Sequence, residues 1–189
     1  MKLAFQLRIW WKEAGFMSNR NAQVCILCED TTHFHFARKY LELMGFNSRN
    51  IIPRHNPKGR STGSGAVFVK ENYEKELKAF HSKNRLSYIL VVMIDDDTKN
   101  HLASLRKTYS PNTTEKILLF SPSRNIESWF HFIDGNAIDE TQDYKRLYQQ
   151  AEPSKFAKDL KRKVCIYSLP DNAPSSLHHA CNELKRLNN

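Results

Sequence analysis

Long apolar runs are missing from this chain of 189 residues. No stretch approaches the ~18–20 apolar residues that a membrane-spanning helix needs, so we expect no such segment. The first 16 residues lack an uninterrupted apolar stretch and a small-residue cleavage site, which makes them a poor secretory signal. We therefore expect residues 1–21 to be a short N-terminal extension and the protein to be cytoplasmic.

Cysteine is scarce, with four residues in the whole chain: Cys25, Cys28, Cys165 and Cys181. Cys25 and Cys28 have the spacing of half a zinc site, but they lie in an apolar run and no second such pair follows. We therefore favour buried free thiols over a zinc site. The lack of a regular disulfide framework agrees with a cytoplasmic location.

Familiar nucleotide-binding and catalytic signatures are also absent. The polar loop 55–65 contains three glycines but matches neither GxxxxGK[ST] nor GxGxxG. Its backbone N–H groups, with Lys58 and Arg60, would suit an anion such as a phosphate, and a flexible polar linker is the equal alternative. No Ser-His-Asp or Cys-His constellation stands out by its spacing.

Positive charge is in excess, with 29 Lys and Arg residues against 20 Asp and Glu residues and a formal net charge of +9. A basic surface favours anionic partners, of which nucleic acid is the first candidate. A purely solubilising surface is the alternative. Composition leaves open whether the chain forms a homo-oligomer.

Strand-like and helix-like segments alternate four times along the chain. The strands are expected at 23–28, 49–53, 87–94 and 116–121, and the helices at 33–44, 67–82, 98–108 and 125–132. This order predicts an α/β fold with a four-stranded, mainly parallel sheet flanked by helices. We expect this core to span residues 22–135.

Residues 136–189 have a more polar, helical pattern. Helices are expected near 143–150, 154–163 and 173–187, and we expect them to form a helical C-terminal extension packed on the core. His33 and His35 flank Phe34 at the start of the first core helix, where capping and surface packing are favoured over metal ligation.

Acidic residues follow three of the predicted strands. In open parallel sheets, ligands bind at the carboxyl ends of strands, which is where these residues fall: Glu29, Asp30, Asp95, Asp96, Asp97 and, on the short helix after the fourth strand, Glu127. Adjacent carboxylates repel one another, and a cation such as Mg²⁺ relieves that repulsion. Asp95 and Asp97 would share one face in extended geometry and are the predicted ligands. Helix capping by Asp97 and a solvated turn are the alternative.

Four stretches in order, together with CED at 28–30, resemble a known family: GRSTGSGAVFV, VVMIDDDT, PSRNIESWF and APSSLHHACNELKRL. The chain resembles the Toprim domain over about residues 22–187. The most similar subtype is that of OLD-family nucleases and their small stand-alone relatives in phage-defence loci.

This resemblance implies a nuclease that uses Mg²⁺ or Mn²⁺. It implies that Glu29 is a metal ligand and general base, that Asp95 and Asp97 are the DxD ligands, and that Glu127 serves a second metal. We expect Arg124 or Lys99 to steady the charge that builds on the phosphate.

The chain departs from the OLD pattern in three respects. Asp30 stands where a glycine often follows the first glutamate, and His33 occupies the place of a second acid. A Walker A sequence is also missing, so any ATPase would be a separate partner subunit.

The leading hypothesis is therefore a metal-dependent DNA or RNA endonuclease of a defence system. The alternative is a non-catalytic Toprim-like subunit that binds nucleic acid or an ATPase. A third reading is a phosphatase-like protein, which Asp95-Asp96-Asp97-Thr98 matches only loosely. Topoisomerase or primase activity would need further domains.

Overall fold

The computed structural model describes residues 21–57, 64–83, 87–97, 100–162 and 169–188. These residues form a fully parallel sheet with the order β2-β1-β3-β4. Its strands are β1 Gln23–Cys28, β2 Ile51–His55, β3 Tyr88–Met93 and β4 Ile117–Phe120. The predicted α/β fold class and parallel sheet are confirmed. Residues 1–20, Lys58, Arg60 and Lys99 lie outside the described residues.

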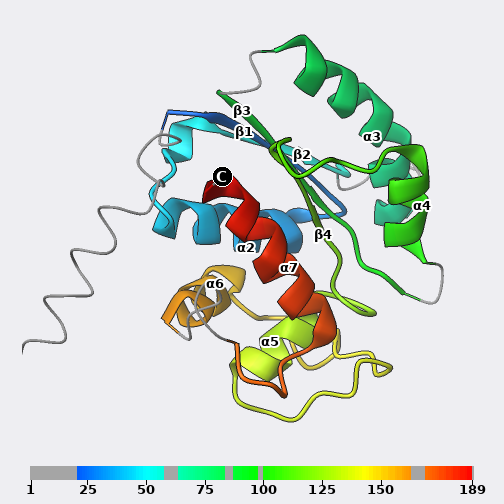
Figure 1. Cartoon of the computed structure of the whole chain (residues 1–189). Helices are drawn as coiled ribbons and strands as arrows, with labels where there is room; N and C mark the ends of the chain where they lie inside the picture. The colour runs from blue at the N-terminus through cyan, green and yellow to red at the C-terminus, as the bar shows by residue number, and fades with distance from the viewer. Residues whose placement is uncertain (1–20, 58–63, 84–86, 98–99, 163–168, 189) are drawn as a thin grey trace, which may run out of the picture.

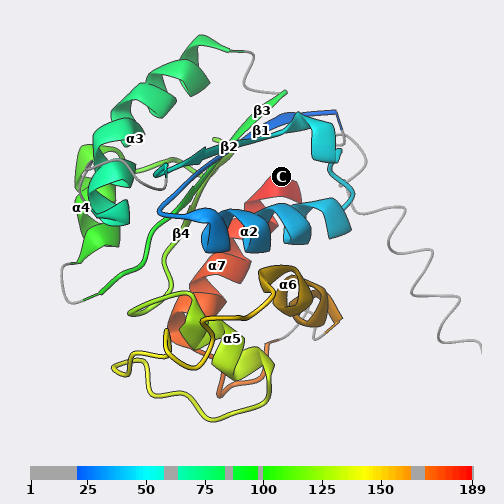
Figure 2. The same cartoon turned by 180° about the vertical axis from the view of Figure 1, so that it is seen from behind.

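The helices cover both faces of the sheet and produce three layers (Figures 1 and 2). One face carries α3 Gly65–Ser82 and α4 His101–Thr108. The other carries α2 Thr31–Leu43, α5 Glu127–Ile133, α6 Pro153–Arg162 and α7 Ser175–Lys185. Two short 3₁₀ turns complete the pattern, at Ser48–Asn50 and Arg186–Asn188.

Successive residues of the central strands enter two different hydrophobic cores. Ile26 and Val91 face the core shared with α2, α5, α6 and α7. Leu27 and Val92 face the core shared with α3 and α4. Every residue of β3 is buried, which explains its continuous apolar run, because a strand covered on both faces has no polar side.

The C-terminal helices share the core of the strands. Helix α6 packs on α2, and Figures 1 and 2 show the two helices side by side. Trp129 of α5 is buried and donates its indole N–H to the Ser176 hydroxyl of α7 at 2.9 Å. This part of the chain therefore completes the layer that covers one face of the sheet.

The helix predicted near 143–150 is wrong, because this segment forms consecutive turns. Its backbone makes i to i+3 bonds, from Leu147 N to Tyr144 O at 3.0 Å and from Tyr148 N to Lys145 O at 3.3 Å. The two tyrosines have helical spacing, but they use it to stack on His131 and to pack edge-on against aromatic rings of α5 and α6.

The helices α2 and α4 begin in different ways. Helix α2 is capped by Asp30, which accepts the N–H groups of Thr32 and His33, whereas Thr31 lies inside the helix. Helix α4 begins at His101 after Asn100, whose backbone is left-handed at φ 50° and whose side chain makes no capping hydrogen bond. Asp97 is therefore not the cap of α4.

The two edges of the sheet are formed by β2 and β4. Strand β2 contains Pro53, which has no N–H group to donate. Helix α7 runs against β4, where Glu183 accepts the Leu119 N–H at 3.2 Å. Strand β2 therefore lacks a backbone donor at Pro53, and the Leu119 donor of β4 is already bonded.

Cys25 and Cys28 are buried free thiols, as predicted. Burial raises the pKa of the Cys25 thiol to about 12, with a further contribution from Glu76, so it stays protonated. Cys181 differs from the prediction because it is disulfide-bonded, with its partner outside the described residues. None of the described helices is both long enough and apolar enough to cross a membrane.

Candidate active site

The candidate site lies where the chain leaves the two central strands. β1 and β3 are neighbours, but the chain continues from β1 to β2 on one side and from β3 to β4 on the other. Such a switch point leaves a crevice at the carboxyl ends of the strands. The register pairs Cys28 with Met93, so Glu29 and Asp95 emerge beside each other.

Glu29 and Asp95 are in direct contact. The Asp95 backbone N–H donates to Glu29 Oε1 at 2.8 Å, and the Asp95 residue is only 5% exposed. Burial raises the pKa of Glu29 to about 7, and the Asp95 carboxylate adds to this rise against the opposing influence of His33 and Lys145. At neutral pH this carboxyl group can therefore both take up and release a proton.

His33 connects two carboxylates across the site. Its Nε2 lies 2.9 Å from Asp95 Oδ1, and its Nδ1 lies 2.9 Å from Asp30 Oδ1. Burial alone would lower the pKa of His33, but Asp95 and Asp30 raise it well above its ordinary value. The imidazolium then donates from both nitrogens. The prediction of a surface role for His33 is wrong, because its residue is only 2% exposed.

Glu127, the first residue of α5, lies near enough to Asp95 for the two charges to interact. Burial raises its pKa, and the nearby Asp95 charge acts in the same direction. Its Oε2 is buried and makes no hydrogen bond. A buried carboxylate oxygen without a donor is unfavourable, so this atom is suited to a cation or a donor that binds from outside.

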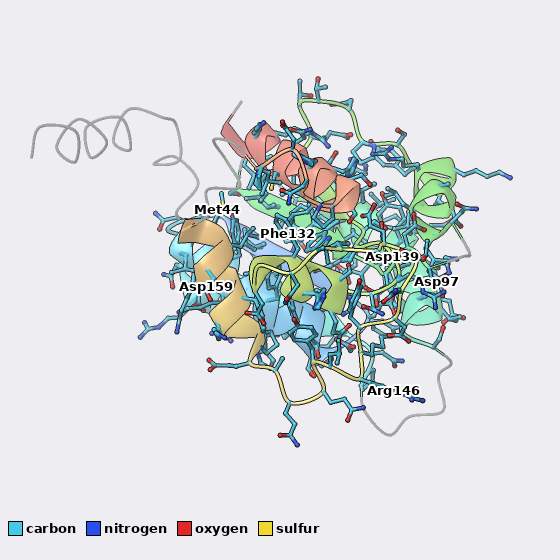
Figure 3. All side chains as sticks on the ribbon, turned by 90° about the horizontal axis from the view of Figure 1, so that it is seen from below. Met44, Asp97, Phe132, Asp139, Arg146 and Asp159 are labelled. Atoms are coloured by element: carbon cyan, nitrogen blue, oxygen red, sulfur yellow. The ribbon has the colours of Figure 1, made fainter. Side chains whose placement is uncertain are left out.

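Lys145 supplies a positive charge that the sequence had not indicated. Its Nζ lies 3.9 Å from Asp95 Oδ2. Burial would lower the pKa of Lys145, but Asp95, Glu127 and Glu29 together raise it. Arg146, the next residue, lies at the rim of the molecule in Figure 3. Of the two neighbouring cations Lys145 and Arg146, only Lys145 is therefore seen to reach the Asp95 carboxylate.

Gly65 packs directly against Glu29 at the start of α3. A Cβ atom built on Gly65 would lie 2.6 Å from Glu29 Cβ and 2.8 Å from Glu29 Oε2. Only glycine allows the first turn of α3 to approach the carboxylate so closely.

The remaining aspartates of the DDD run point elsewhere. Asp96 forms a parallel bridge with Ser123, and its Oδ1 accepts the Leu102 N–H at 3.4 Å. Asp97 Oδ1 lies 3.6 Å from His101 Nε2, and its side chain is 37% exposed. The structure thus gathers Glu29, Asp95 and Glu127, while the contact described for Asp97 is with a histidine of α4.

Arg124 lies in the loop that follows β4. Its backbone is left-handed at φ 64°, and its N–H donates to Asp96 O at 3.4 Å. This contact joins the loop to the segment after β3. It places the Arg124 backbone, directly before Asn125, at the same edge of the sheet as the carboxylates.

Across the described ranges, no three His, Cys, Asp or Glu side chains are arranged to hold a metal ion. The donor chemistry of Glu29, Asp95 and Glu127 nevertheless fits a hard divalent cation, which prefers carboxylate oxygens. Glu127 Oε2 has no hydrogen-bond donor, and the Asp95 charge adds to the rise that burial causes in the pKa of Glu29. A cation would join His33 and Lys145 in offsetting that charge.

The stability of the metal-free protein is expected to depend on the protonation of Glu29. Its pKa of about 7 in the folded protein exceeds the ordinary value of about 4.3. The resulting stabilisation is fully present below about pH 4 and is lost as the pH rises through about 7. For the wild-type protein in EDTA, the free energy of unfolding measured with urea should be lower at pH 8 than at pH 5, by up to about 3 kcal/mol. Glu29→Gln should remove that part of the decrease, and identical pH profiles for the two proteins would contradict the assignment.

Comparison with known proteins adds no relatives: no protein-family model matches the sequence, and neither curated proteins nor solved structures contain a match.

Proposed function

We propose that the protein is a Mg²⁺- or Mn²⁺-dependent nuclease that hydrolyses phosphodiesters of DNA or RNA at this site. The observations that carry the proposal are the contact of Glu29 with Asp95 at the switch point of a parallel sheet and the interaction of the Glu127 charge with that of Asp95. Glu29 follows β1, Asp95 follows β3, and Glu127 begins the helix after β4, an order that the Toprim resemblance implies. A cytoplasmic role in defence, with an ATPase as a separate subunit, belongs to the same proposal.

Glu29, Asp95 and Glu127 are the residues that would hold the cation, and a bound cation supplies Lewis-acid stabilisation of charge on the phosphate. The Toprim resemblance gives Glu29 a second part, as the general base that accepts the proton of the attacking water. Lys145 would offset negative charge on the phosphate. This role was expected for Lys99 or Arg124. His33 holds Asp95 in position through Asp95 Oδ1.

A specific observation favours a second candidate, a non-catalytic subunit that binds nucleic acid or an ATPase. Both oxygens of Asp95 already have cationic neighbours, His33 at 2.9 Å and Lys145 at 3.9 Å. These two side chains offset the carboxylate charge without a metal. In this case the net charge of +9 would act in binding, which should weaken steeply with salt.

The two candidates predict different outcomes in one assay. The purified chain is incubated with supercoiled plasmid and with single-stranded RNA, in Mg²⁺, Mn²⁺ or EDTA. The nuclease proposal predicts nicked or cut product with either metal and none in EDTA. Salt-sensitive binding without cleavage in any metal would reject it in favour of the binding subunit. Hydrolysis of a generic phosphatase substrate alone would instead indicate the phosphatase-like reading.

A further inference from the structure

A hydrogen-bonded link joins the loop after β4 to the turn segment that carries Lys145. Asn125 is only 2% exposed, and its Nδ2 donates to Asp143 Oδ1 at 2.9 Å. The same Asp143 oxygen accepts the backbone N–H of Lys145 at 2.9 Å. Asp143 therefore connects a buried residue of the core to the backbone from which the Lys145 side chain extends.

The position of Lys145 depends on such an anchor. Its side chain is 58% exposed, and its segment is neither helix nor strand, so no regular element holds it near Asp95. The neighbouring Tyr144 is buried, stacks on His131 at 4.4 Å between ring centroids and accepts the Asp139 N–H at 3.0 Å. Tyr144 fixes the segment on α5, and the Asp143 link sets the backbone of Lys145 relative to Asn125.

We infer that Asn125 and Asp143 are positioning residues that hold Lys145 against the carboxylates of the active site. The inference rests on the proposed function, because Lys145 acts there on the phosphate. It also makes residues 136–150 part of the active site, beyond the core boundary expected at residue 135. Asn125 stands two residues before Glu127. The stretch 125–127 would therefore supply both the Glu127 carboxylate and the residue that anchors Lys145.

A double-mutant cycle in the metal-dependent cleavage assay tests this link. Lys145→Met and Asp143→Ala are each expected to lower kcat by about 10–100-fold with a smaller change in KM. The double variant should be no slower than Lys145→Met, because Asp143 acts through Lys145. Losses that multiply in the double variant would overturn the inference.

Conservative variants separate positioning from folding. Asp143→Asn keeps an oxygen that can accept from Asn125 and from the Lys145 backbone, so it should retain most of the activity. Asn125→Leu is close in size but cannot donate, and it should behave like Asp143→Ala with little loss of thermal stability. An Asp143→Asn variant as slow as Asp143→Ala would contradict the link.

Lys155 offers a matched control for Lys145. Its side chain is 60% exposed and its Nζ lies 3.8 Å from Asp134 Oδ1, close to the values for Lys145. Lys155→Met should leave cleavage unchanged.

A readout independent of cleavage is the acetylation rate of each lysine, followed by mass spectrometry. Asp143→Ala should speed acetylation at Lys145 and not at Lys155, and an unchanged rate at Lys145 would reject the inference. If wild type cleaves nothing while the Lys145 rate still rises, the proposed function fails and the link stands.

Discussion

Asp95→Asn is expected to reduce metal-dependent cleavage by about 10³-fold while the chain remains folded. Asp95 is the residue that all other parts of the site share: its backbone N–H binds Glu29, its Oδ1 meets His33, and its Oδ2 faces Lys145. Asparagine keeps the shape and can still accept from the imidazolium. It removes the charge, which is what a divalent cation needs from this position.

The measurement is the single-turnover cleavage rate of each variant, with urea unfolding to verify the fold. Glu29→Gln should cause a similar loss, because it removes a ligand and the proton acceptor together. Asp171→Asn makes the same charge change at an exposed residue and should cleave as wild type does. A folded Asp95→Asn variant with the wild-type rate would rule out catalysis at this site.

Gly65→Ala is the second change with a large expected effect, although it adds only a methyl group. The added carbon would lie within 3.0 Å of three Glu29 atoms, two of which are Cβ and the backbone O. Either α3 or Glu29 must move. We expect a loss of about 1–3 kcal/mol in the free energy of unfolding. Cleavage should fall by about 10²-fold, because a shift of about 1 Å in a catalytic group is enough for that.

Gly135→Ala is the control for this change. Gly135 has φ +93°, and an added Cβ would meet no atom within 4 Å. It should cost about 1 kcal/mol through backbone strain alone and leave cleavage unchanged. Equal activity losses in the two variants would show that general destabilisation, rather than contact with Glu29, explains the effect of Gly65→Ala.

Three of the strands were predictable because each is a short apolar run that ends at polar residues, whereas β2 Ile51–His55 is only partly apolar and lies two residues beyond the predicted 49–53. The segment 23–28 matches β1 residue for residue, and 87–94 contains β3 Tyr88–Met93 with one more residue at each end. The acids at the strand ends followed from the same pattern. A parallel sheet brings the carboxyl ends of its strands to one edge, so the approach of Glu29 to Asp95 could be expected from the sequence alone.

The basic half of the site could not be predicted in the same way. Lys145 reaches Asp95 across 50 residues of sequence, from a segment whose tyrosine spacing imitates a helix. His33 is read from sequence as a residue of the first helical turn, and only the capping geometry of Asp30 turns it inward. For Asp97, the contact that the structure describes is with His101 of α4, and the alternation of side chains along a strand gives no indication of that pairing.

The two margins of the sheet limit how copies of this protein can associate. A strand from a second molecule needs a row of unsatisfied N–H and C=O groups to pair with. Pro53 interrupts that row on one side, and Glu183 already occupies the Leu119 N–H on the other. Pairing of a second molecule with either edge strand is therefore hindered, and on the β4 side it would first require α7 to detach.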